Sequence, residues 1–136
     1  MPFYQSLGMK LIHEKHFSDF SLYFLASLSD DVKYPEDTKS EESNQFLKNL
    51  FYPILEITHN HNTENQESFS YHNGNTDPVG FSRLTFIVDD VNNTVSNLEK
   101  SGGSLLNDNS VPRLGSLIVQ DPDRYYVELI QRNSTL

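Results

Sequence analysis

The chain has 136 residues, with 10 lysines and arginines against 19 aspartates and glutamates, a formal net charge of −9 and no cysteine. This length fits a single domain and is too short for two independent cores of ordinary size. The acidic balance argues against nucleic acid or an anionic membrane surface as partner, because both reward clustered positive charge, and the lack of cysteine excludes disulfides and thiolate zinc sites.

The opening of the chain carries no export or membrane signal. The stretch MPFYQSLGMK has neither a basic n-region nor an apolar h-region, and no segment of the chain reaches 18 uninterrupted apolar residues. We therefore expect a soluble, cytoplasmic protein.

Strand-like segments dominate the first half of the chain. After a few helix-like residues, the segments 9–17 and 20–27 are rich in aromatic and β-branched residues, and Ser18-Asp19 between them is turn-like. This pattern predicts two neighbouring antiparallel strands. Residues 30–45 are polar and acidic and follow neither the helical nor the strand period, which predicts a surface loop before a short helical turn at 46–51.

The predicted strand 53–60, with the sequence PILEITHN, closes the first half and holds Glu56 among apolar and β-branched neighbours. A long, Asn-rich connection follows at 61–80 and contains an Asn-Gly turn signal and a proline. It is the only boundary inside the chain that the sequence indicates.

A strand at 80–90 and a helix at 89–103 are predicted to open the second half. Asp89 or Asp90 can cap this helix, and Gly102 is well placed to end it. Its apolar face is predicted from the residues at i, i+4 and i+7, which are Val91, Val95 and Leu98. Three further strands are predicted at 104–108, 115–123 and 125–131.

The order of these elements repeats. The second half reads β-α-β-β-β and the first reads the same without its opening strand, which predicts one α+β domain with mainly antiparallel sheets around a concave site. Its parts within 1–136 are module one at 1–60, the connection at 61–80 and module two at 81–131. Glu56 and Glu128 then occupy equivalent points in the last strand of each module. A glutamate on the wet face of an antiparallel sheet is the ordinary alternative for either residue alone.

Several short motifs occur in order along residues 3–131. The most specific is the block Leu55-Glu56-Ile57-Thr58-His59-Asn60. The others are Tyr71-His72-Asn73-Gly74-Asn75, Gly80-Phe81, Gln120-Asp121-Pro122-Asp123, and Tyr125 with Glu128. Together they resemble glyoxalase I, or lactoylglutathione lyase, of the vicinal oxygen chelate superfamily.

In that family, as the resemblance implies, paired modules hold zinc or nickel through four side chains, two from each module. The enzyme moves a proton between two carbons of the hemithioacetal of methylglyoxal and glutathione, through an enediolate, and forms S-lactoylglutathione. The metal stabilises negative charge on the substrate oxygens while a neighbouring carboxylate takes the proton. By this resemblance Glu56 is a metal ligand, Glu128 is a metal ligand and the catalytic base, and Asn60 contacts glutathione.

The sequence departs from the family pattern at this metal site. Arg83 stands where the family has its histidine ligand, and arginine has no lone pair for a metal. The opening strand, which supplies another ligand, is missing ahead of the first helix-like residues. We therefore hypothesise that Arg83 lies between Glu56 and Glu128 and pairs with both carboxylates in place of the metal. Three further departures on the glutathione side are Val79, Leu114 and Arg124.

Two functional interpretations follow and both stay open. The first is a lactoylglutathione lyase that acts on the glutathione hemithioacetal, completed where necessary by a partner chain. The second is a metal-free glyoxalase-like binding or assembly module, or a fragment of a two-domain glyoxalase. Without an opening strand, one edge of the strand 53–60 is expected to lack a partner, which favours a homodimer or pairing with another glyoxalase module.

The histidines suggest weaker alternatives. His13 and His16 lack the His-Glu-x-x-His spacing and are expected at the surface, on opposite faces of a strand. His59 and His61 could share one strand face and bind a metal, but the strand is expected to end at Asn60.

Overall fold

The computed structural model describes residues 1–106 and 115–133, so that Leu114 and the end of the predicted strand 104–108 lie outside the described residues. The helices are α1 (Pro2–Ser6), α2 (Glu41–Asn49) and α3 (Val91–Lys100), with a 3₁₀-helical turn η1 (Thr63–Asn65). The strands are β1 (Lys10–His16), β2 (Phe20–Ala26), β3 (Ile54–Asn60), β4 (Arg83–Val88), β5 (Ser104–Leu105), β6 (Ser116–Gln120) and β7 (Tyr126–Gln131). The predicted α+β class is confirmed.

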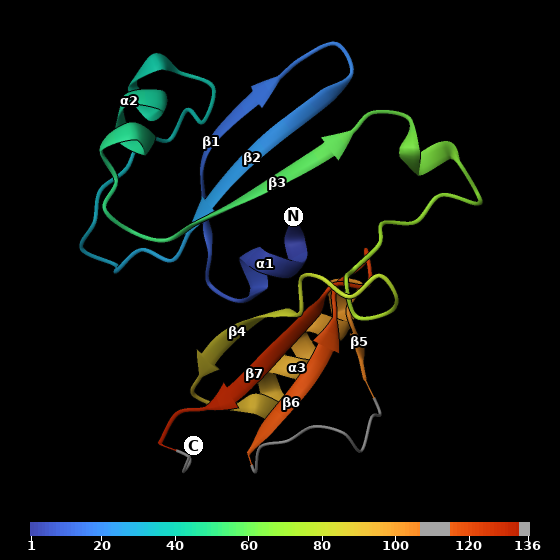
Figure 1. The fold of residues 1–136 in the computed structure, drawn as a ribbon. Coiled ribbons are helices and arrows are strands. Elements are labelled where there is room, and N and C mark those ends of the chain that lie inside the picture. The colour runs from blue at the N-terminus through green and yellow to red at the C-terminus, as the bar shows by residue number, and fades with distance from the viewer. Residues whose placement is uncertain (107–114, 134–136) are drawn as a thin grey trace. The chain divides into compact units, whose positions relative to one another are not determined.

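These elements fall into two compact units (Figure 1). One unit is Gly8–Phe69, and the other joins Met1–Leu7 to Ser70–Leu136. Among the described residues, no helix has the length and apolar character needed to cross a membrane.

In the unit Gly8–Phe69, β1, β2 and β3 form one antiparallel sheet in that order (Figure 1). The three strands predicted in the first half are therefore confirmed, apart from small differences at their ends. Glu56 is the third residue of β3 and lies opposite Phe24 of β2. The register of β1 shifts between Leu11 and His13, and at this bulge the consecutive residues Ile12 and His13 are both buried.

The helix α2 begins earlier than the sequence predicts. The prediction of a surface loop over 30–45 is wrong for its last residues, because the helix starts at Glu41. Ser40 caps it by accepting a hydrogen bond from the backbone N–H of Ser43 at 3.1 Å. Glu41 and Glu42 occupy the first turn, where carboxylates are favoured by the positive end of the helix dipole.

The second unit holds a four-stranded sheet in the order β4-β7-β6-β5. β4 runs parallel to β7 and the other pairs are antiparallel, so the predicted β-α-β-β-β order is confirmed. α3 connects β4 to β5 and is capped by Asp90, whose carboxylate accepts from the N–H of Asn93 at 2.9 Å. Its predicted apolar face is also confirmed, because the residues at i, i+4 and i+7 are all buried. Gly102 follows the helix with a φ of +89°, a conformation that glycine adopts without strain.

The short helix α1 packs in this second unit rather than with β1, which follows it in the chain. Phe3 and Tyr4 are buried. The Tyr4 hydroxyl donates to Asp121 Oδ2 at 2.7 Å, and Asp121 Oδ1 accepts the N–H groups of Asp123 and Tyr125 at 2.9 Å each. Burial and the Asp121 carboxylate raise the pKa of Tyr4 far above its ordinary value, so the hydroxyl keeps its proton and donates.

Replacing Tyr4 by Phe tests how firmly α1 is held. We expect the free energy of unfolding to fall by about 1–3 kcal/mol, because the buried carboxylate of Asp121 loses its hydroxyl donor. Urea unfolding followed by circular dichroism measures the change. Tyr34→Phe is the control, because Tyr34 is 36% exposed. Equal losses in the two variants would show that the Tyr4 hydroxyl contributes nothing specific.

Candidate functional site

Glu128 is buried in the centre of the second unit's sheet. It is the third residue of β7, an interior strand, and it lies opposite Thr85 of β4 and Ile118 of β6. Only 1% of the residue is exposed, although it carries a carboxylate. The ordinary alternative of a glutamate on a wet sheet face is therefore wrong for Glu128. A carboxylate in such a place needs compensating donors or a cation.

Arg83 supplies that cation from the neighbouring strand. Its Nε donates to Glu128 Oε2 at 3.0 Å, and the hydroxyl of Thr85 donates to the same oxygen at 3.2 Å. Arg83 and Thr85 are two residues apart in β4, so both side chains leave the same face of the sheet. The side chain of Arg83 is 29% exposed, against 2% for Glu128. The predicted pairing of Arg83 with Glu128 is present.

The second oxygen of Glu128 has no such partner. Oε1 is buried and lacks a hydrogen bond within the part of the chain that the structure describes. Oε2 of the carboxylate therefore accepts from a guanidinium and a hydroxyl, while the lone pairs of Oε1 accept no hydrogen bond from the described residues. Oε1 therefore keeps the capacity to accept a hydrogen bond or a proton.

Glu56 and Asn60 belong to the other unit. They lie four residues apart on β3 and share one face of that strand, and both are exposed. Within the described residues of its own unit, Glu56 has no ion-pair partner. Glu56 and Glu128 are each the third residue of the last strand in an antiparallel three-strand run, as the internal repeat predicts. A pairing of Arg83 with Glu56 would span the two units and stays a prediction.

Two of the sequence motifs fold against the turn that precedes β7. The side-chain amide of Asn73 donates to the carbonyl of Arg124 at 2.8 Å, and the rings of Phe81 and Tyr125 lie edge to face with centroids 6.0 Å apart. Gly74 has a φ of +78°, and a Cβ added there would lie 2.3 Å from the carbonyl oxygen of Phe81. The close approach of these motifs therefore requires glycine at position 74.

His13 is buried, so the expectation of a surface position is wrong for it. The β1 bulge turns the side chain inward, and Nδ1 lies 2.7 Å from the hydroxyl of Ser43 on α2. Because that hydroxyl donates to the carbonyl of Ser40 at 2.8 Å, His13 Nδ1 is the donor to Ser43. Burial, together with the charge of Lys15, lowers the pKa of His13, which favours the neutral ring.

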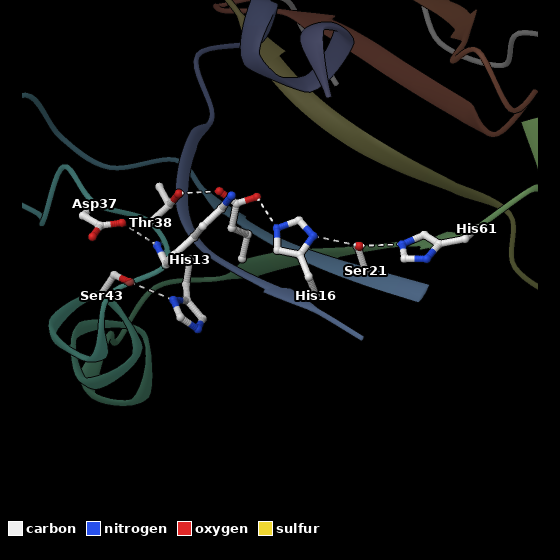
Figure 2. Close-up of polar contacts among 9 residues, drawn as sticks. His13, His16, Ser21, Asp37, Thr38, Ser43 and His61 are labelled. Atoms are coloured by element: carbon white, nitrogen blue, oxygen red, sulfur yellow. Dashed lines mark hydrogen bonds and ion pairs between the residues drawn. The ribbon is translucent and has the colours of Figure 1, made fainter. Parts of the chain in front are cut away.

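Two other histidines of this unit, His16 and His61, belong to a hydrogen-bonded row that the sequence did not reveal. His16 lies between Glu14 and Ser21, and Ser21 contacts His61 (Figure 2). The side chain of His16 is 42% exposed, as expected, and lines a cavity of about 420 Å³. The signal lay in strand pairing, since His16 is opposite Ser21 across β1 and β2. The sequence alone does not give the register of β1 and β2, so it could not predict that His16 lies opposite Ser21.

The proposed metal role of His59 and His61 receives no support. β3 ends at Asn60, as expected, and His59 contacts Glu64 at 3.1 Å while His61 contacts Ser21 at 2.8 Å. Across residues 1–106 and 115–133, no group of three or more His, Asp or Glu side chains could hold a metal ion.

Comparison with known sequences finds one family along nearly the whole chain. The profile of the Glyoxalase/Bleomycin resistance protein/Dioxygenase superfamily matches residues 1–129. A lactoylglutathione lyase of Pseudomonas putida is 40% identical over 128 residues, which cover 92% of this chain and 72% of that protein. A lactoylglutathione lyase of Pseudomonas aeruginosa is 33% identical, with 92% and 69% covered. Glyoxalase I of Saccharomyces cerevisiae is 37% identical over 130 residues, but this chain spans only 38% of its length.

Solved structures give the same fold. Glyoxalase I from Zea mays superposes with a TM-score of 0.59 at 24% identity, covering 98% of this chain and 40% of that chain. The trypanothione-dependent glyoxalase I of Leishmania major superposes with a TM-score of 0.55 at 21% identity, covering 95% and 73%. At these identities the likeness is one of fold.

Proposed function

Because the chain belongs to the glyoxalase/bleomycin resistance protein/dioxygenase superfamily, we propose that it acts as a lactoylglutathione lyase. Its substrate is the hemithioacetal of methylglyoxal and glutathione, and its product is S-lactoylglutathione. Its proposed cellular location is the cytoplasm. Two Pseudomonas relatives with that name, 40% and 33% identical over 92% of this chain, support the proposal. The single observation that carries it is the buried carboxylate of Glu128, which lies in the last strand of the repeat with one oxygen unpaired.

The proposal gives each candidate residue a role. Oε1 of Glu128 takes the proton from the hydroxyl-bearing carbon next to the carbonyl and returns it to the carbonyl carbon. The hydroxyl proton passes to the former carbonyl oxygen, so that the product is an isomer of the substrate. Negative charge builds on the substrate oxygens between these two steps. Arg83, whose Nε lies 3.0 Å from Glu128, supplies positive charge beside them. On β3, Glu56 is the second carboxylate of the site and Asn60 contacts glutathione.

Lactoylglutathione lyases of this family are metal-dependent, and the resemblance points to zinc or nickel. The side chains at Glu128 and Arg83 do not fit such an ion. Glu128 already pairs with a guanidinium, Arg83 has no lone pair to offer, and the described residues contain no group of three metal-binding side chains. The proposed proton transfer therefore rests on Glu128 and Arg83 without a metal-bound step.

The Arg83–Glu128 pair also favours a second candidate function. A glyoxalase-like module that binds a glutathione conjugate without transforming it needs the fold and Asn60 but no Lewis acid. A carboxylate paired with an internal cation keeps such a fold intact, since it leaves no buried charge uncompensated. In either case a homodimer, or pairing with another glyoxalase module, remains part of the proposal.

One assay separates these candidates. The purified chain, dialysed against a chelator and analysed for residual metal, is given methylglyoxal and glutathione, and S-lactoylglutathione is measured chromatographically. The lyase proposal predicts product formation above the buffer rate in the chelated protein. Absence of product both in the chelated protein and after zinc or nickel is added would overturn it. Calorimetric binding of S-lactoylglutathione by such an inactive protein would support the binding module.

A further inference from the structure

A continuous row of hydrogen bonds crosses the unit Gly8–Phe69 (Figure 2). Glu14 Oε2 lies 2.8 Å from His16 Nε2, and His16 Nδ1 lies 2.9 Å from the hydroxyl of Ser21. The same hydroxyl lies 2.8 Å from His61 Nε2, and His61 Nδ1 lies 3.3 Å from the carbonyl oxygen of Ser18. Four hydrogen bonds therefore join β1, β2 and the residue that follows β3.

Both ends of this row can only accept a hydrogen bond. The Ser18 end is a backbone carbonyl. At the other end burial opposes ionisation of Glu14, but hydrogen bonds from Thr38 and His16 outweigh burial and hold the pKa of Glu14 below its ordinary value. Glu14 is therefore a carboxylate at neutral pH, and it already accepts the Thr38 hydroxyl at 2.7 Å through its other oxygen.

The row needs one proton for each of its hydrogen bonds. Four hydrogen bonds require four protons, whereas the Ser21 hydroxyl supplies one and two neutral imidazoles supply one each. The row is therefore one proton short when both histidines are neutral. If both rings were fully protonated, each would donate to Ser21 and the hydroxyl proton would have no acceptor in the row. A single additional proton fills every bond.

The position of Glu14 decides where that proton rests. His16 lies directly against the carboxylate, so an imidazolium at His16 makes a charge-assisted hydrogen bond. Ser21 then accepts from His16 and donates to His61, and the remaining N–H of His61 donates to the Ser18 carbonyl. A shift of protons through the hydroxyl moves the charge from His16 to His61 without breaking the row.

The surrounding groups do not complete the row themselves. Lys39, ahead of α2, acts on Glu14 through its charge, and the ring of Tyr23 on β2 meets His16 edge on at 5.9 Å. On the other side the ring of His59 lies 5.4 Å from His61, and Glu64 holds His59 at 3.1 Å. The carboxylate of Asp19 accepts from the Ser18 hydroxyl at 3.4 Å.

We propose that this row is a proton-operated clamp on the end of β3. Uptake of one proton by the pair His16 and His61 completes the four bonds and fastens the residues after β3 to the turn between β1 and β2. The backbone hydrogen bond from His61 N–H to the carbonyl of Asp19, at 2.9 Å, lies in the same place and reports on the clamp. Release of the proton removes one of the four bonds. The inference concerns this unit alone and does not depend on the proposed reaction.

Amide hydrogen exchange measured by NMR tests the clamp between about pH 5 and pH 8, where histidine changes charge. After correction for intrinsic exchange, the His61 amide is expected to exchange about five- to tenfold faster at the upper pH than at the lower pH. This increase corresponds to the loss of one hydrogen bond. Ser21→Ala breaks the row and should abolish this pH dependence. Ser18→Ala, in the same turn, removes only a side chain outside the row and should keep it.

The imidazole nitrogen shifts of the unmodified protein give a second readout. When the row holds its additional proton, His16 is expected to carry protons on both nitrogens while His61 carries one. His72, in the other unit, is an internal reference whose ring contacts only the Pro78 carbonyl among the interactions described. A flat exchange profile in the unmodified protein, or an undiminished rise in Ser21→Ala, would overturn the clamp.

Discussion

Replacing Glu128 by Gln is expected to lower the rate of S-lactoylglutathione formation by at least about 100-fold, the usual contribution of a positioned general base. Glutamine matches glutamate in shape, and its carbonyl oxygen can still accept from Arg83 and Thr85. The fold should survive while the proton acceptor is lost. Initial rates under identical substrate concentrations, with circular dichroism spectra of both proteins, measure the effect.

Glu99→Gln is the matched control, because it makes the same chemical change at an exposed position on α3 of the same unit. Its rate should equal that of the unmodified chain. Near-normal activity of Glu128→Gln would remove Glu128 from the reaction and would leave the proposed proton transfer without a base.

Replacing Arg83 by Met is expected to lower the free energy of unfolding by about 2–4 kcal/mol, because the buried carboxylate of Glu128 loses its cation. The value lies below the full cost of breaking a buried ion pair, since Arg83 itself is 29% exposed. Chemical denaturation with urea, followed at neutral pH, measures the change.

Two further variants make this test specific. Arg132→Met removes an arginine from an exposed pair with Asp89 and should cost less than about 1 kcal/mol. The double variant Arg83→Met/Glu128→Leu removes both charges and should recover most of the loss, since no buried charge is then left unpaired. A double variant no more stable than Arg83→Met would show that the loss comes from packing rather than from charge.

The sequence predicted the elements whose signals are local. The helix α3 was found from an apolar period of 3.6 and from its cap at Asp90, both of which lie within a few residues. The strands of both units were found from their β-branched and aromatic composition. The repeat followed from their order, and it placed Glu56 and Glu128 at matching points of β3 and β7.

Features set by contacts between distant residues escaped prediction. The burial of His13 depends on a bulge in β1 and on the approach of Ser43 from α2, 30 residues along the chain. The early start of α2 was missed although Ser40 and the acidic residues after it are cap signals, because the acidic composition of 30–45 favoured a loop.

The candidate site was predicted in part. The pairing of Arg83 with Glu128 followed from the resemblance, and the parallel register of β4 and β7 explains it, because Thr85 faces Glu128 and Arg83 lies two residues away. The burial of one unpaired oxygen of Glu128 could not be predicted, because it depends on strands covering both edges of β7. The role of Glu56 remains a prediction.

The place of α1 bears on the order in which the chain folds during synthesis. Residues 1–7 leave the ribosome before residues 8–133, yet the Tyr4 hydroxyl donates to Asp121, and the hydroxyl oxygens of Ser6 and Ser101 lie 2.8 Å apart. The segment Gly8–Phe69 is thus an insertion within the other unit. It can complete its own sheet before α1 has the residues of its unit to pack against. A fragment beginning at residue 70 would lack Phe3 and Tyr4 of its unit, whereas a fragment ending at residue 69 would keep the whole of the unit Gly8–Phe69.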